Sequence, residues 1–169
     1  MTTILKLKRT GVSPADPPSD LRESLGEPIL LKLALDGVQS LDPAKLKLAA
    51  NGTAPLRPQM MLTLLSYCYA ARIYGSRDIE WAIRNNATVR YIVRTCPGWR
   101  SMRRFRRNNR ELLEQCLVYV LKKAWLLQLD ADCASADWSG AGSALDRKSL
   151  AEARQKIEVA IIMDTAEND

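Results

Sequence analysis

Residues 58–74, with the sequence PQMMLTLLSYCYAARIY, decide the expected fold. Apolar side chains fall on almost every side of a helix drawn through this stretch, which is typical of a helix buried on several sides. Pro58 suits a first helical position, because the backbone N–H that proline lacks would have no partner there. Gly75 can end the helix in a left-handed conformation, and Ser76 can cap the next helix. The stretch therefore predicts a central helix with other helices packed around it.

Two short helical patterns and one long one follow this central helix. The short ones cover residues 77–84 and 87–95 and are separated by two asparagines. Such a pair has the dimensions of a helix-turn-helix, although many structural bundles also contain one. The long pattern starts at Asn108 or Asn109 and runs to about Leu129, with apolar residues recurring along one side.

Regular patterns are shorter before the central helix. Prolines and a glycine crowd residues 10–28, which we interpret as a linker. Short helices are expected at residues 29–35 and 44–50, and Asn51-Gly52 would end the second of them.

The last helix is expected at residues 147–163, where Ser149 and Glu152 have the spacing of a capping box. We therefore divide the chain into three parts. An N-terminal extension, partly disordered with short helices, covers residues 1–54. A helical domain covers residues 55–129, and an acidic linker with a C-terminal helix covers residues 130–169. The expected fold is all-α: a compact helical bundle with a helix-turn-helix-like unit and a long amphipathic helix on its C-terminal side.

Charge is distributed unevenly over these three parts. Residues 55–129 hold 14 basic and 4 acidic residues, whereas residues 130–169 hold 4 basic and 9 acidic ones. Within the middle part, residues 100–110 contain six arginines. A basic middle followed by an acidic end indicates a polyanionic partner for the middle alone.

The arginine-rich segment has the features of a phosphate-binding helix. Met102 and Phe105, three residues apart, would anchor the helix to the core and leave several guanidinium groups facing water. Arginine donates in a planar fork that suits phosphates and guanine edges. Ser101 would cap this helix and bring its positive end near a nucleic-acid backbone. The cluster does not separate DNA from RNA. Two alternatives stay open: intramolecular or protein partners for the arginines, and a merely solvated basic face balanced by Glu111, Glu114 and the acidic tail.

In the helix-turn-helix interpretation, Thr88 and two arginines would project from the second short helix. The candidate nucleic-acid-binding residues are Arg77, Arg90, Arg94, Arg100, Ser101, Arg103, Arg104, Arg106, Arg107 and Arg110.

Other functional classes find little support in the sequence. The chain has no histidine, and its four cysteines contain no C-x-x-C pair, so no metal or other cofactor is expected. Cys68 and Cys116 fall on apolar faces and are expected to be buried thiols in a reducing compartment, whereas Cys96 lies in a turn. No signal peptide and no apolar run long enough to span a membrane is visible. We expect a soluble, cytoplasmic protein.

Residues 56–125 resemble the N-terminal domain of DDE-type insertion-sequence transposases, the transposase InsH N-terminal domain. Five short motifs in order carry the resemblance: LRPQMML at 56–62, LSYCYA at 65–70, GSRDIE at 75–80, VRYI at 89–92, and Pro97 followed by SMRRFRR at 101–107. The resemblance implies a helical module that helps a transposase of a mobile element to recognise DNA during transposition, a form of DNA recombination.

The chain departs from the family in two respects. Gly98-Trp99 replaces the family's aspartate-histidine at the turn, and no ribonuclease-H-like domain with three metal-binding acidic residues follows. We therefore expect no enzyme activity and no catalytic residue. The expected function is non-catalytic DNA binding by a protein or fragment derived from a transposase. The alternative is a protein-interaction module, in which residues 112–127 pair with a second copy or with a full-length transposase.

Overall fold

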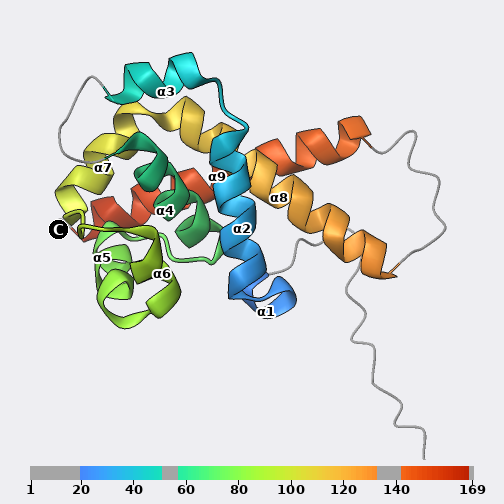
Figure 1. Ribbon diagram of the computed structural model, residues 1–169, viewed down its shortest axis with the longest axis horizontal. Coiled ribbons are helices and arrows are strands. Elements are labelled where there is room, and N and C mark those ends of the chain that lie inside the picture. Colours follow the sequence, from blue (N-terminus) through green and yellow to red (C-terminus); the bar gives the residue numbers. More distant parts are fainter. Residues whose placement is uncertain (1–19, 51–56, 133–141, 168–169) are drawn as a thin grey trace, which may run out of the picture.

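The computed structural model describes residues 20–50, 57–132 and 142–167, and within these ranges it contains nine α-helices and no strand (Figure 1). The all-α prediction is confirmed. The helices are α1 (Leu21–Leu25), α2 (Glu27–Gln39), α3 (Pro43–Ala50), α4 (Pro58–Ala70), α5 (Ser76–Asn85), α6 (Ala87–Ile92), α7 (Trp99–Asn108), α8 (Arg110–Asp132) and α9 (Gly142–Ala166).

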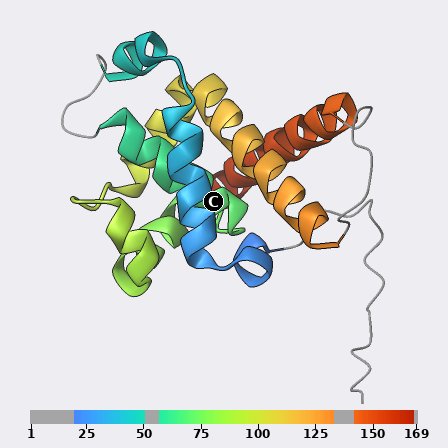
Figure 2. The ribbon, with the colours of Figure 1, turned by 45° about the vertical axis from the view of Figure 1, so that its right-hand side comes forward.

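The central helix α4 is the best-buried element of the fold. Every residue from 61 to 71 is buried, as its all-round apolar pattern predicts. Helix α4 contacts α2, α8 and α9, and Figures 1 and 2 show α9 crossing α8. The core therefore has α4 at its centre, and α2, α8 and α9, each at least as long as α4, pack around it.

The apolar stripe of α8 faces this core. Its buried members are Leu112, Leu113, Cys116, Leu117, Val120, Leu121 and Ala124. Leu127, at the end of the stripe, is 43% exposed. The stripe thus closes the core of its own chain.

The core extends across both expected domain boundaries. Leu30 of α2 and Ile157 of α9 are fully buried in the same apolar cluster as Leu117 of α8. The division at residues 54 and 130 stays a prediction from sequence, whereas the packing joins helices from all three parts.

The end of α4 differs from the expectation. Gly75 has an ordinary φ of −64° and precedes α5, so its predicted left-handed conformation is wrong. The left-handed residue is Arg72, with φ 61°. Around it the Ile73 N–H donates to the Cys68 carbonyl at 2.8 Å and the Arg72 N–H to the Tyr69 carbonyl at 3.2 Å. These two bonds form a Schellman motif, which satisfies the carbonyls that the helix end leaves open.

The short helices α5 and α6 are separated as expected, but α6 is shorter than predicted. Asn86 caps α6 by accepting a 3.0 Å hydrogen bond from the Val89 N–H, and the helix ends at Ile92 rather than Thr95. Thr88 does not project freely, because its hydroxyl donates to Glu27 of α2 at 2.9 Å. Hydrogen bonds from Asn86 and Thr88 lower the pKa of Glu27. This carboxylate therefore fixes α6 against α2.

Two predictions on the N-terminal side are wrong in extent. Helix α1 lies within the expected linker, and Asp20 caps it by accepting a 2.8 Å bond from the Arg22 N–H. Helix α2 has 13 residues instead of one or two turns, and Pro28 lies in its first turn. A proline in the first turn is compatible with a helix. A high proportion of prolines in a segment therefore does not show whether that segment is a linker or the start of a helix. Asn51-Gly52 lies outside the described residues.

The capping box predicted for the last helix is also wrong. Helix α9 begins at Gly142, and Ser149 is buried inside it, where none of the described residues forms a hydrogen bond with its hydroxyl. Residues 133–141, within the acidic linker expected after residue 129, lie outside the described ranges. Among the helices within those ranges, none has the length and hydropathy needed to cross a bilayer.

The cysteines provide a direct test of this packing. Cys68 and Cys116 are fully buried, which raises the pKa of each thiol to about 12, whereas Cys96 is exposed. Because the thiolate is the reactive form, iodoacetamide at about pH 8 should modify Cys96 and spare the other two until the protein unfolds. Mass spectrometry of a Cys133→Ser variant would map the sites. Modification of Cys68 or Cys116 in the folded protein would contradict this core.

Candidate functional site

The arginine-rich segment forms α7, which begins earlier than expected. Gly98 precedes the helix in an extended conformation with φ −71°, and Trp99 is its first residue. Ser101 is therefore an exposed residue of the first turn and not the cap, so that prediction is wrong. Met102 is fully buried and Phe105 packs against the core, which confirms the two predicted anchors.

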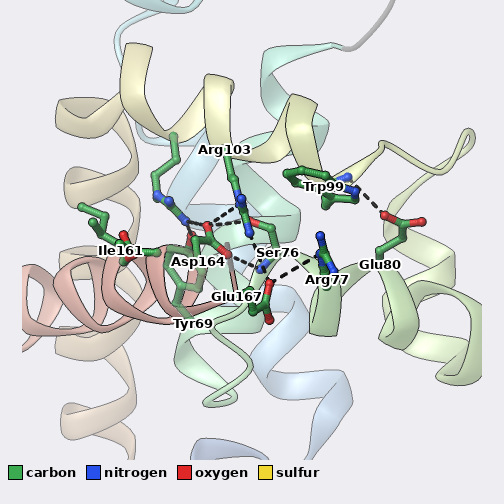
Figure 3. A network of polar contacts seen from close by, with 11 residues as sticks. Tyr69, Ser76, Arg77, Glu80, Trp99, Arg103, Ile161, Asp164 and Glu167 are labelled. Carbon is green, nitrogen blue, oxygen red and sulfur yellow. Dashed lines mark hydrogen bonds and ion pairs between the residues drawn. The ribbon is translucent and has the colours of Figure 1, made fainter. Parts of the chain in front are cut away.

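A single carboxylate, that of Asp164 in α9, holds two of the arginines (Figure 3). Its Oδ2 lies 2.7 Å from Nη1 of Arg106 and 3.4 Å from Nε of Arg103. The three side chains are only 4%, 8% and 11% exposed, respectively. The expectation that Arg103 and Arg106 face water is therefore wrong. Arg106 follows the buried Met102 by four residues, which places it on the same side of α7.

The same carboxylate reaches α5. Asp164 accepts 2.7 Å hydrogen bonds from both the backbone N–H and the hydroxyl of Ser76. Ser76 is the first residue of α5, so its predicted capping role is wrong and its hydroxyl serves Asp164 instead. Burying a charge without partners is costly, so these four contacts are what makes a buried Asp164 tolerable. Asp164 thereby joins α5, α7 and α9.

Tyr69 of the central helix completes this cluster. Its hydroxyl accepts a 3.2 Å hydrogen bond from Nη1 of Arg106. Burial raises the pKa of Tyr69 to about 12, so the phenol stays protonated and neutral at physiological pH. The arginine helix is thus tied directly to α4.

Trp99 and Glu167 form a second layer around Arg103 (Figure 3). Nη2 of Arg103 lies 3.2 Å from Glu167, and Nε of Arg77 lies 3.8 Å from the same carboxylate. The guanidinium carbons of Arg103, Arg77 and Arg100 lie 4.4, 4.9 and 4.8 Å from the centre of the Trp99 ring. Three cations therefore surround one indole, a favourable arrangement because the ring face is electronegative.

Glu80 fixes the start of α7 from the opposite side. It accepts a 3.2 Å hydrogen bond from the Trp99 N–H and forms a 2.9 Å ion pair with Arg84. One free N–H at the N-terminus of α7 is thereby satisfied.

The remaining candidates point elsewhere. Arg100, Arg104 and Arg107 are exposed on α7, and none of them has a carboxylate within ion-pair distance among the described residues. Arg110, at the start of α8, is exposed and pairs with Glu158 of α9.

The two candidates near α6 are also exposed. Arg90 donates to the carbonyls of Ile83 and Arg84, where α5 ends, and Arg94 follows the end of α6. The structure thus gathers the candidates into two groups, one inside the Asp164 cluster and one on the surface.

Sequence reasoning missed Asp164, Tyr69, Glu167, Trp99 and Ser76 as parts of this site. One pattern could have found Asp164. It follows Ala153, Ile157 and Ala160 in the buried stripe of α9, so a carboxylate occupies a core position. A buried charge at such a position requires a cationic partner.

The described residues define an all-α domain with one basic helix held against its core by a buried carboxylate. Residues 31–108 match a protein-family model described as Transposase domain (DUF772), so this part of the chain is a transposase-related region, and the expected relationship is confirmed. The match runs from α2 to the end of α7 and starts 25 residues before Leu56, where the sequence resemblance began. No curated protein and no solved structure gives a significant match.

The comparison leaves α8 and α9 outside the matched region. No group of three or more histidine, cysteine or acidic side chains that could hold a metal ion occurs in the part of the chain that the structure describes.

Proposed function

We propose that this transposase-derived chain is a non-catalytic DNA-binding protein or fragment that contacts duplex phosphates through α7. The observation that carries the proposal is the exposure of Arg100, Arg104 and Arg107 on a helix whose other face is anchored in the core. Guanidinium groups without a carboxylate partner gain most from a polyphosphate, because binding relieves their repulsion and releases counterions.

The buried arginines have a positioning role in this proposal. Arg103 and Arg106 are held by Asp164 and fix the orientation of α7, so toward the duplex backbone they contribute rigidity rather than contacts. Such anchoring lowers the entropy that the helix loses on binding. Ser101 lies three residues before Arg104 on exposed helix and supplies a hydroxyl next to it.

Arg77, Arg90 and Arg94 extend the proposed surface toward α5 and α6. All three are exposed, and these helices precede α7 in the chain and pack beside it through α5. We assign them to the flank of the interface. Arg77 pairs with Glu167, and Arg90 donates to backbone carbonyls. We therefore expect both to be weaker hydrogen-bond donors to a DNA phosphate than the exposed arginines of α7.

The runner-up function, self-pairing through residues 112–127 or pairing with a full-length transposase, has less support. The stripe that would form such an interface is largely buried in the core of this chain. Pairing through it would require α8 to leave α2, α4 and α9.

The test of DNA binding is a fluorescence-anisotropy titration against duplex DNA, single-stranded DNA and RNA at several salt concentrations. Arg104→Ala and Arg107→Ala should each weaken duplex binding, and each should flatten the logarithmic salt dependence by about 0.9 for every phosphate that the variant no longer neutralises. Arg147→Ala, an exposed arginine in the first turns of α9, is the matched control and should change neither quantity. Unchanged binding in both α7 variants would refute the proposed interface.

A further inference from the structure

A pocket of about 280 Å³ lies between α7, the start of α8 and α9. Its lining residues are Arg103, Arg106, Arg107, Arg110, Ile157, Ile161, Asp164 and Thr165. The four arginines have the spacing i, i+3, i+4 and i+7, which places them on one face of a helix, and the pocket shows that this face continues past the turn at Asn109.

The pocket wall carries more positive than negative charge. Asp164 is the single carboxylate in the lining and already serves both Arg103 and Arg106. Arg110 is balanced from outside the lining by Glu158. Arg107 is exposed and has no carboxylate within ion-pair distance in the described ranges. An anion in the pocket would meet at least one guanidinium, that of Arg107, which forms no ion pair with a described carboxylate.

Arg106 adds donors from the buried side. Both of the contacts that the described residues give its guanidinium, to Asp164 and to Tyr69, use Nη1. A guanidinium presents five N–H donors in a fixed fork, so Arg106 keeps donating capacity while its charge is held in place.

The side of the pocket that α9 contributes is partly apolar. Ile157 and Ile161 line it together with Asp164 and Thr165, and Figure 3 places Ile161 beside Asp164 on α9. A basic cluster with two isoleucines beside it fits a phosphate attached to an organic group better than a free inorganic ion. Ile161 is only partly buried, so its side chain is open to a ligand.

A terminal phosphate fits this pocket better than an internal one. A phosphate within a strand has a nucleotide on both sides, whereas a phosphate at a strand end has one, so less of the strand must fit beside a pocket of about 280 Å³. A phosphomonoester also carries nearly two negative charges at about pH 7, against one for a phosphodiester, and thus matches a cluster of arginines better.

We propose that this pocket binds a phosphomonoester, supplied by the terminal phosphate of a DNA strand. The source of the ligand rests on the DNA-binding function proposed above, whereas the phosphate chemistry rests on the pocket alone. The exposed arginines of α7 would hold the backbone of the same duplex.

The experiment compares duplexes that are identical except for a phosphate or a hydroxyl at the strand end. The wild-type protein should prefer the phosphorylated end by about tenfold, the effect of one additional charge-assisted contact. Ile161→Trp fills the pocket without changing charge and should abolish this preference while keeping affinity for the hydroxyl-ended duplex. Ile162→Trp, a change at the adjacent and 64% exposed position, is the matched control and should keep the preference.

The same comparison of strand ends can be made with an arginine variant. Arg107→Met changes an exposed residue and should not affect folding. The variant should have a smaller ratio of affinity for the phosphorylated end to affinity for the hydroxyl end. Any general contribution of Arg107 to DNA binding affects both affinities equally and so cancels in this ratio. Equal affinity for both ends in the wild type, with duplex binding intact, would overturn the pocket and leave the proposed function standing.

If the protein binds no duplex, a titration with a nucleoside monophosphate and with inorganic phosphate decides the matter. Binding that Ile161→Trp blocks would assign the pocket to a free phosphate compound. No binding of either would overturn the inference.

Discussion

Replacement of Asp164 by asparagine should lower the free energy of unfolding by about 3–5 kcal/mol, the usual cost of removing one partner from a buried ion pair. The substitution keeps the shape of the side chain but removes the charge that Arg103 and Arg106 require. Arg106, which is 8% exposed, would then keep the neutral Tyr69 hydroxyl but would lose its carboxylate. Arg103, which is 11% exposed, would still have Glu167 at 3.2 Å, so the larger part of the cost falls on Arg106. The asparagine oxygen could still accept one hydrogen bond from Ser76, whereas its amide nitrogen donates and cannot replace the second carboxylate oxygen. The substitution therefore removes the charge and one acceptor together.

Urea denaturation followed by circular dichroism measures this effect. The matched control is Asp146→Asn, which removes a 2.6 Å ion pair with Lys122 in which the two side chains are 55% and 37% exposed. Exposed pairs contribute at most about 1 kcal/mol, so the control should be nearly neutral. Equal destabilisation by the two changes would show that Asp164 is not the anchor of α7.

The elements that sequence predicted best are those governed by local rules. The all-round apolar pattern identified α4, and two asparagines marked the break between α5 and α6, where Asn86 indeed caps the second helix. The spacing of Met102 and Phe105 identified the inner face of α7. In each case the deciding residues lie within a few positions of one another, and the interactions concerned act over one or two helical turns.

The polar cluster could not be predicted in the same way. Ser76 and Asp164 are 88 residues apart in sequence, and only the packing of α9 against the start of α5 brings them together. The sequence placed six arginines in one segment, but whether each faces water or the core depends on that packing. Charged side chains are seldom buried, so the sequence predicts the arginines of this segment on the surface, and Arg106 is an exception because the buried carboxylate of Asp164 pairs with it.

Helix ends were the other source of error, for a related reason. Arg72 takes the left-handed conformation that glycine favours, at a cost that the two hydrogen bonds of the Schellman motif offset. Ser149 has the spacing of a capping box but lies inside α9, because the helix extends further toward its N-terminus. Short capping patterns are common by chance, and they define a helix start only where the preceding chain leaves the helical conformation.

Leu30→Ala should destabilise the protein by about 2–5 kcal/mol. Leu30 is fully buried in the cluster that α2 shares with α4 and α8, so its truncation leaves a cavity in the main core. The sequence predicts residues 1–54 as an extension beside the helical domain, and this division stays a prediction. The family match begins at residue 31, within α2.

Ile29→Ala provides the control at the neighbouring position. Ile29 is 45% exposed, so the same truncation of the side chain should change stability by no more than about 0.5 kcal/mol. A large difference between the two variants in urea denaturation would make α2 an integral part of the DNA-binding domain proposed here. If both variants lowered the free energy of unfolding by the same small amount, α2 would be a loosely attached extension. The arginine helix would then have to be stabilised by α4, α5, α8 and α9 alone.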